Sequence, residues 1–201
     1  HAADFRPPAT PLATVDPYMS VWSYSDHLYD AWPVHWTGAV QAMGGMLRVD
    51  GKPYRFMGPD ALCKQAMEQT RLTVDATQTH YTFTAGGVEL ALTFTTPMLP
   101  EDFALLTAPV TFLTFTVRAV DNVEHDVALY FDASAEWAVN KPNQKVIWRR
   151  EQGPEGMTLL SFGSKDQPVL EKDGDDLRID WGYFYVCLPA TQGWTGAVAS
   201  H

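Results

Sequence analysis

The chain has 201 residues, of which 46% are hydrophobic, 19% charged and 12% aromatic. This composition is too apolar for a disordered chain and too low in charge for a coiled coil. The formal net charge of −10 argues against nucleic acid or an anionic membrane surface as a partner, because both attract clusters of basic side chains. No apolar run approaches the roughly 20 residues that span a bilayer, so we expect no membrane insertion.

Residues 1–38 differ in character from the rest of the chain. Prolines, among them the Pro7-Pro8 pair, interrupt regular structure, while six tryptophan and tyrosine residues crowd the same stretch. A linker does not need to bury aromatic rings. We therefore predict an irregular, proline- and aromatic-rich N-terminal segment that packs on the remaining domain, with one short strand at 19–24.

Residues 39–201 alternate between apolar and polar side chains, which is typical of strands. The clearest case is a hairpin, in which residues 81–85 and 88–94 alternate on either side of Gly86-Gly87. Asp50-Gly51 and Asp121-Asn122 mark other turns. Further strands are predicted at 46–49, 54–57, 70–75, 113–117, 127–137, 145–149, 158–162, 178–188 and 196–200, and short helical turns at 59–65 and 100–106.

About eleven short strands with polar turns and little helix indicate an all-β fold, an antiparallel β-sandwich. The last predicted strand runs into His201 without a closing turn. We therefore expect the sandwich of residues 39–201 to be truncated at its C-terminus.

Motifs for covalent, metal or cofactor chemistry are sparse. For Cys63 and Cys187 we favour two buried free thiols over a disulfide bridge. The sequence has no nucleotide-binding loop, no paired metal-binding histidines and no nucleophile elbow, so we expect no cofactor and no metal. The acidic loop with Asp173, Asp175 and Asp176 favours a solvated turn over a calcium site.

The candidate site residues of the aromatic segment combine indole and phenol rings with polar groups; they are Asp16, Tyr18, Trp22, Trp32, His35 and Trp36. This set predicts a cleft wall or an interface with another domain. Because aromatic faces pack on sugar rings, it also fits a carbohydrate-binding platform. Acidic residues in such loops usually cap turns, and His35 fits a core histidine bonded to backbone as well as a ligand-binding one.

Asp132 and Glu136 are weaker acid and base candidates. On one face of the strand predicted at 127–137, their Cα atoms would be ~13 Å apart. That separation is wide for a glycosidase pair, and a polar outer strand face is the favoured interpretation.

Several strings resemble the N-terminal region of the glutaminase A family of fungi and Bacteroidetes. They follow one another along the chain at 6–9, 16–23, 35–38, 54–58, 81–90, 130–140 and 180–183. The resemblance implies a secreted or periplasmic protein several hundred residues longer, with a β-sandwich followed by a helical, toroid-like region that hydrolyses glutamine to glutamate and ammonia. It assigns no catalytic residue to this stretch.

We therefore interpret the chain as a non-catalytic N-terminal module of a glutaminase-like amidohydrolase, inactive alone, which docks the helical catalytic domain of the same protein and lines its cleft. The expected ligand is a small molecule, glutamine or a sugar. The alternative is a carbohydrate-binding module or the sandwich half of a glycoside hydrolase. A third interpretation is a complete small enzyme that uses Asp132 and Glu136.

Overall fold

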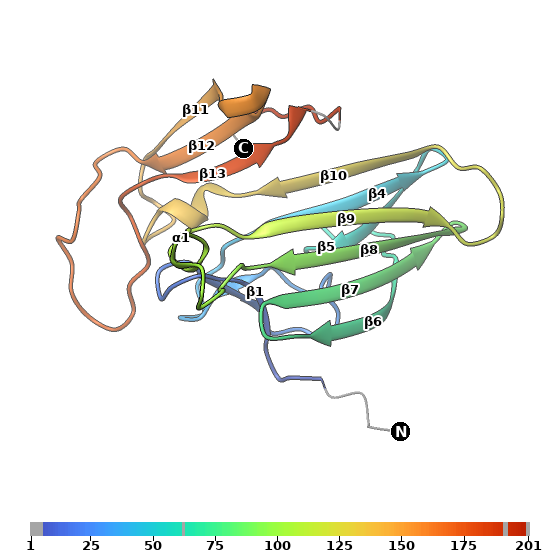
Figure 1. Cartoon of the computed structure of the whole chain (residues 1–201), viewed down its shortest axis with the longest axis horizontal. Coiled ribbons are helices and arrows are strands. Elements are labelled where there is room, and N and C mark those ends of the chain that lie inside the picture. Colours follow the sequence, from blue (N-terminus) through green and yellow to red (C-terminus); the bar gives the residue numbers. More distant parts are fainter. Residues whose placement is uncertain (1–5, 62, 191–192, 200–201) are drawn as a thin grey trace. The chain divides into compact units, whose positions relative to one another are not determined.

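A computed structural model describes residues 6–61, 63–190 and 193–199 of the chain (Figure 1). The chain divides into two compact units, His1–Ser134 and Ala135–His201. Both are built from antiparallel strands with little helix, so the predicted fold class is confirmed. Within the described residues, no helix has the length and apolar character that a membrane span requires.

The first unit contains three sheets. β1 (Thr10–Thr14), β2 (Ser20–Ser23) and β3 (Val34–His35) form one sheet in the order β1-β2-β3. β4 (Met43–Val49), β5 (Lys52–Met57) and β10 (Val127–Ala133) form the second in the order β10-β4-β5. β6 (Glu68–Val74), β7 (Gln78–Ala85), β8 (Val88–Thr95) and β9 (Phe112–Ala119) form the third in chain order. A single turn of helix, α1 (Phe103–Leu106), lies between β8 and β9.

The second and third sheets pack face to face around phenylalanine rings. The ring of Phe56 on β5 lies 5.8 Å from that of Phe83 on β7 and 6.0 Å from that of Phe115 on β9. Phe115 in turn lies 6.2 Å from Phe131 on β10. Because these rings come from both sheets, the aromatic core holds the two layers together. The sandwich expected from the alternation is thus present in this unit.

The aromatic segment is more regular than predicted, since it contributes three strands instead of one. β1 pairs with β2 through a register shift between Pro11 and Ala13. The Thr79 hydroxyl of β7 donates a hydrogen bond of 2.7 Å to the Pro11 carbonyl, and the Leu28 amide donates one of 2.9 Å to the side chain of Gln69 on β6. These bonds tie the segment to the four-stranded sheet. The boundary expected near residue 38 stays a prediction.

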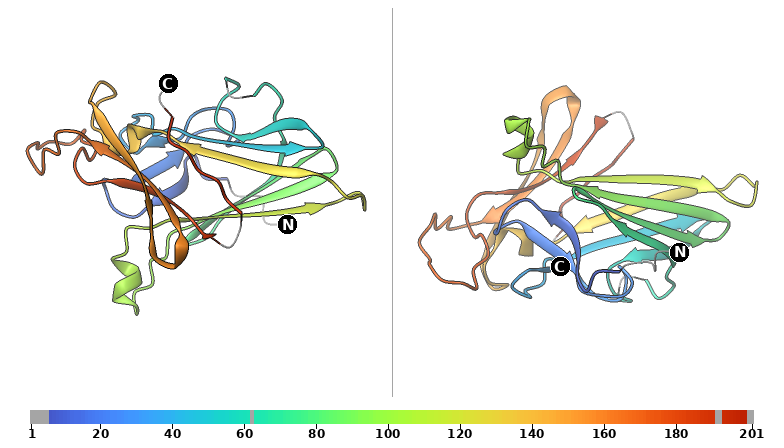
Figure 2. Two further views of the ribbon diagram at one scale, coloured as in Figure 1. Left: turned by 90° about the horizontal axis from the view of Figure 1, so that it is seen from above. Right: turned by 60° about the horizontal axis from the view of Figure 1, so that its bottom comes forward.

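The second unit contains the sheet β11-β12-β13, formed by β11 (Val146–Gln152), β12 (Thr158–Ser164) and β13 (Phe184–Leu188). Two 3-10 turns, η1 (Ala135–Ala138) and η2 (Pro154–Gly156), accompany it. Phe184 stacks on Phe162 at 5.4 Å and lies 4.9 Å from the buried Trp137 of η1. Figure 2 shows these strands in orange and red from two further directions.

Several predicted elements differ from the structure, among them the strand predicted at 127–137, which ends at Ala133. The strand predicted at 178–188 begins only at Phe184, and 196–199 form no strand. The helical turn predicted at 59–65 is absent from its described residues, whereas the turn predicted at 100–106 is confirmed as α1. Gly182 has a φ of +75°, which an extended strand does not adopt, and this accounts for the late start of β13.

Candidate functional site

A tight turn between β1 and β2 brings several of the predicted site residues together. Asp16 is exposed, and its Oδ1 accepts hydrogen bonds from the backbone amides of Tyr18 at 2.8 Å and Met19 at 2.9 Å. The Val15 amide closes the same turn by donating to the Met19 carbonyl at 2.9 Å. Asp16 therefore acts as the cap of this turn, as short acidic side chains commonly do.

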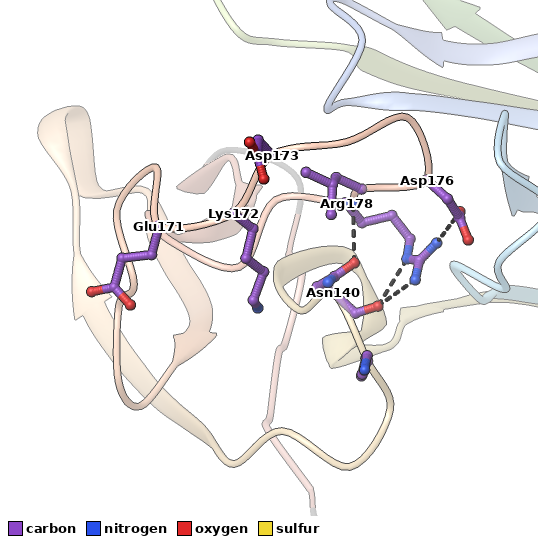
Figure 3. Close-up of a pocket in the computed structure, with 8 residues that line it drawn as sticks. Asn140, Glu171, Lys172, Asp173, Asp176 and Arg178 are labelled. Carbon is purple, nitrogen blue, oxygen red and sulfur yellow. Dashed lines mark hydrogen bonds and ion pairs between the residues drawn. The ribbon is translucent and has the colours of Figure 1, made fainter.

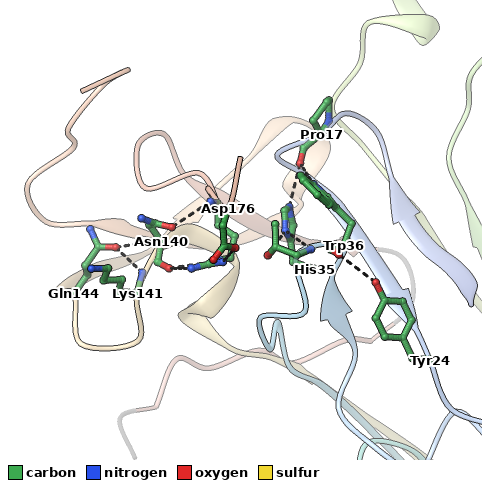
Figure 4. A network of polar contacts seen from close by, with 10 residues as sticks. Pro17, Tyr24, His35, Trp36, Asn140, Lys141, Gln144 and Asp176 are labelled. Atoms are coloured by element: carbon green, nitrogen blue, oxygen red, sulfur yellow. Dashed lines mark hydrogen bonds and ion pairs between the residues drawn. The ribbon is translucent and has the colours of Figure 1, made fainter. Parts of the chain in front are cut away.

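His35 is fully buried beneath the turn (Figure 4). Its Nε2 lies 3.1 Å from the Pro17 carbonyl oxygen, which can only accept, so Nε2 carries the proton. Its Nδ1 then accepts from the Thr37 hydroxyl at 3.0 Å and the Thr37 amide at 3.3 Å. Both ring nitrogens are bonded to groups of this chain, which makes His35 a positioning residue for the turn.

Trp36 shares the Pro17 carbonyl with His35. Its indole Nε1 donates to that oxygen at 2.8 Å, and the Tyr24 hydroxyl donates to the Trp36 carbonyl at 3.3 Å (Figure 4). Tyr18, Tyr24 and Trp36 remain 38%, 51% and 46% exposed, respectively. We call these three residues the aromatic surface. Four of the six predicted site residues, Asp16, Tyr18, His35 and Trp36, thus gather around Pro17.

The other two predicted aromatic residues lie apart from this exposed set. Trp22 is half-buried on β2 opposite Val34 of β3, and its Nε1 donates to the Ser20 hydroxyl at 2.9 Å. Trp32 is half-buried in the chain that leads into β3. Their partial burial suits packing better than stacking on a ligand.

Asp132 and Glu136 do not share a strand face, so that prediction is wrong. β10 ends at Ala133, and Glu136 lies in η1. The alternation stops because burial of Trp137 against Phe184 turns the chain into a 3-10 helix. Asp132 stands two residues after Tyr130 on β10, and burial together with this carboxylate raises the pKa of Tyr130 to about 12.

A shallow hollow of about 440 Å³ opens in the second unit (Figure 3). Its lining mixes basic and acidic side chains; it consists of Asn140, Lys141, Glu171, Lys172, Asp173, Asp176, Leu177 and Arg178. The guanidinium of Arg178 donates from Nε and Nη2 to the Asn140 carbonyl at 2.9 and 2.6 Å and from Nη1 to Asp176 at 3.0 Å. These bonds connect the acidic loop that precedes Arg178 to Asn140, which lies near the start of the second unit.

Asp180, which follows the acidic loop in the sequence, is almost fully buried. It accepts a hydrogen bond of 2.9 Å from Gln144 Nε2 and pairs with the Lys172 ammonium. Asp176, one of the three carboxylates considered for calcium, is bound to Arg178. In the part of the chain that the structure describes, no group of three or more histidine, cysteine or carboxylate side chains is arranged so that it could hold a metal ion.

Both cysteines are free thiols, but neither is buried as predicted. Cys63 is half-buried and Cys187 is exposed. Cys187 shares the exposed side of β13 with Tyr185, since burial alternates along this strand.

A further polar cluster, which the sequence did not reveal as a site, joins two turns of the first unit. His125, in the loop between β9 and β10, has Nδ1 2.7 Å from Asp50 Oδ2 and Nε2 3.0 Å from Asp121 Oδ1. These hydrogen bonds raise the pKa of His125 and lower the pKa of both carboxyl groups. We call the three residues the histidine clamp. Asp50-Gly51 and Asp121-Asn122 were recognisable as turns, but their pairing through His125 was not.

The chain matches two family models, both described as domains of unknown function, DUF4964 over residues 1–69 and DUF5127 over residues 77–201. It is 29% identical over 190 residues to "Glutaminase A" of Aspergillus oryzae (strain ATCC 42149 / RIB 40), covering 90% of this chain and 27% of that protein. It is 22% identical over 211 residues to "Probable glutaminase/05536" of Arthroderma benhamiae (strain ATCC MYA-4681 / CBS 112371), covering 94% and 24%.

The chain therefore spans about a quarter of the length of the curated relatives that it matches. No solved structure matches it significantly. The resemblance expected from the sequence strings is confirmed over most of the chain. Since the DUF5127 model alone covers more than half of these residues, the chain belongs to the DUF5127 family and corresponds to the N-terminal region of glutaminase A proteins.

Proposed function

We propose that the chain is a non-catalytic β-sandwich module of a glutaminase-like amidohydrolase, which hydrolyses glutamine to glutamate and ammonia. The observation that carries the proposal is the 29% identity to glutaminase A over 90% of this chain. That match covers 27% of the relative. In our proposal the catalytic acid and base lie in the rest of the same polypeptide, which the family resemblance implies to be helical. A secreted or periplasmic location belongs to this proposal.

The bonding around the 16–19 turn supports a structural role for its polar residues. The Asp16 carboxylate accepts two backbone amides, and both ring nitrogens of His35 face groups of the turn and of Thr37. A general base needs a free lone pair directed at substrate, and the hydrogen bonds of both ring nitrogens argue against that role for His35. The aromatic surface is the exposed part of this region, and in our proposal it lines one wall of the glutamine-binding cleft.

Alanine substitutions at Trp36 and Tyr18 in the full-length protein test the cleft wall. We expect each to lower kcat/KM for glutamine by about tenfold, a loss of roughly 1.4 kcal/mol of transition-state stabilisation. Val74→Ala on β6 is the matched control, since Val74 is 38% exposed like Tyr18 but lies outside the aromatic surface. Unchanged kinetics in both variants would remove the cleft wall from the proposal.

The exposure of the aromatic surface also favours a second candidate, a carbohydrate-binding module or the sandwich half of a glycoside hydrolase. Rings that are 38–51% exposed leave a face on which a sugar ring can pack. Titration of oligosaccharides against tryptophan fluorescence tests this candidate, with Trp36→Ala as the variant that should abolish the signal. No fluorescence change up to millimolar sugar would exclude it.

A further inference from the structure

The connection between β8 and β9 exposes an unusual number of apolar side chains. Met98 and Leu99 are 40% and 46% exposed, and Phe103 is 76% exposed, the largest value among the large hydrophobic residues described. α1, which contains Phe103, buries none of its residues. We call residues 98–106 the apolar loop. Figure 2 shows its helical turn, in yellow-green, standing away from the strands of the four-stranded sheet in both views.

Local hydrogen bonds hold this loop in shape. Asp102 caps α1, because its carboxylate accepts from the Leu105 amide at 3.1 Å. The Thr107 hydroxyl donates to the Phe103 carbonyl at 2.8 Å and closes the other end. At the base of the loop, the hydroxyls of Thr96 and Thr111 are hydrogen-bonded at 2.9 Å. The apolar side chains are therefore displayed on an ordered support, and little ordering entropy would oppose their binding to a partner.

We propose that the apolar loop is an anchor that inserts Phe103 and Leu99 into an apolar recess on the part of the full-length polypeptide outside these 201 residues. The inference deepens the proposed function and rests on it for the presence of that part. The chain spans only 27% and 24% of its relatives, so most of such a protein is available as the partner. Clustered apolar side chains that stand out from a surface mark interaction sites.

Charge favours this partner over a second copy or a membrane. The chain carries a formal net charge of −10, and Glu101 and Asp102 lie within the apolar loop itself. Like charges oppose the approach of two copies and of an anionic bilayer. A recess on the same polypeptide is favoured for a further reason, because the chain connection raises its effective concentration at the apolar loop.

Photo-cross-linking in the full-length protein tests the anchor. We would replace Ala104, which is exposed beside Phe103, with p-benzoylphenylalanine, and place the same probe at Val123 as the control. We expect the first probe to link the peptide around 98–110 to a peptide outside residues 1–201 of the same molecule. The Val123 probe, in the loop between β9 and β10 and 56% exposed, should give no such link.

Isotope-labelled and unlabelled protein, mixed before irradiation, identifies links between molecules. A dominant link to a second copy, a link confined to residues 1–201, or no link at position 104 would each overturn the anchor. So would binding of the full-length protein to phosphatidylserine vesicles that Phe103→Ser abolishes. Val123→Ser is the control for that substitution.

Glutamine hydrolysis by the same preparation separates the two proposals. Hydrolysis without the cross-link leaves the proposed function standing and removes the anchor. The cross-link without hydrolysis keeps the anchor and removes the glutaminase assignment.

Discussion

His125 connects two turns of the first unit because each of its ring nitrogens meets a carboxylate from a different turn. Asp50 and Asp121 are the charged groups that face it, and the Asp50 carboxylate also accepts the Asp126 amide at 2.9 Å. Asp126 itself pairs with Arg48 of β4 at 3.6 Å. A histidine that donates from both nitrogens is a cation, so the histidine clamp is a charged network at the end of the sandwich.

We predict that the histidine clamp makes unfolding depend on pH. The pKa of His125 is raised above 6.5, so its contribution is complete below pH 6.5 and is lost as pH rises through the higher folded-state pKa. The pKa values of Asp50 and Asp121 are lowered from 3.8, so their contribution is present above that pH and is lost as pH falls through their folded-state values. The stabilisation is therefore largest between these limits.

Urea unfolding from pH 5 to 9 measures this dependence. His125→Gln should lower the midpoint at pH 6 and flatten its decline toward pH 9, and Asp121→Asn should do so in part. His27→Gln is the control, because His27 is an exposed histidine with a single carboxylate neighbour. An unaltered pH profile in His125→Gln would show that the clamp contributes nothing.

Gly87 offers a second test of the clamp at the level of one residue. Its φ is +82°, and an added Cβ would lie 2.2 Å from Asp121 Oδ2 and 2.8 Å from His125 Nε2. Gly51 has the same φ with nothing within 4 Å of its Cβ position. Gly51→Ala should therefore cost only the backbone strain, on the order of 1 kcal/mol. Gly87→Ala should lower the free energy of unfolding measurably more than Gly51→Ala does. Equal free energies of unfolding for the two variants would contradict a clash between the added Cβ and the histidine clamp.

At the scale of elements, β4 lacks a side chain where the ring of Phe56 on the neighbouring strand β5 of the same sheet packs. A Cβ at Gly45 would lie 2.3 Å from the ring of Phe56, which is fully buried against Phe83 and Phe115. Glycine at this position lets the ring fill the space over β4. The aromatic core and the missing side chain are therefore parts of one packing arrangement.

We predict that Gly45→Ala destabilises the protein by roughly 1–3 kcal/mol through overpacking. Phe56→Leu, which shortens the crowding side chain, should recover part of that loss in the double variant. Chemical denaturation of the wild type, both single variants and the double variant gives the coupling energy. Strictly additive effects would contradict direct contact between position 45 and the ring.

The sequence predicted elements well where one face of a sheet is buried. Tyr81, Phe83, Leu90 and Leu92 alternate around Gly86-Gly87, and β7 and β8 follow that alternation with these side chains buried. Prediction from the sequence failed where tertiary packing overrode the alternation of apolar and polar residues or the effect of a proline. β10 stops before Trp137, which turns into the core of the second unit, and β1 forms although Pro11 lies within it.

The site was partly predictable because its residues are close in sequence. Asp16, Tyr18, His35 and Trp36 were selected together, and they do surround Pro17. Their hydrogen-bond partners were not predictable. An aspartate that caps a turn and a histidine that is buried in a core are residue types that also occur in ligand-binding sites. Contacts such as Arg178 to Asn140 and His125 to Asp50 join residues 38 and 75 positions apart, and no local pattern encodes them.

At the scale of the whole molecule, each compact unit has its own aromatic core. Phe56, Phe83 and Phe115 serve the first, and Trp137, Phe162 and Phe184 serve the second. Apolar side chains that no strand covers lie outside these cores, above all in the apolar loop. Together with relatives that are about four times as long, this arrangement supports a module that works within a larger polypeptide.

Ammonia release from glutamine tests this central proposal most directly. The full-length protein should release glutamate and ammonia in equal amounts, while residues 1–201 with a β-rich circular dichroism spectrum should release none above the background. Hydrolysis by residues 1–201 alone would contradict the non-catalytic role. Absence of glutamine hydrolysis by the full-length protein would contradict the glutaminase-like assignment.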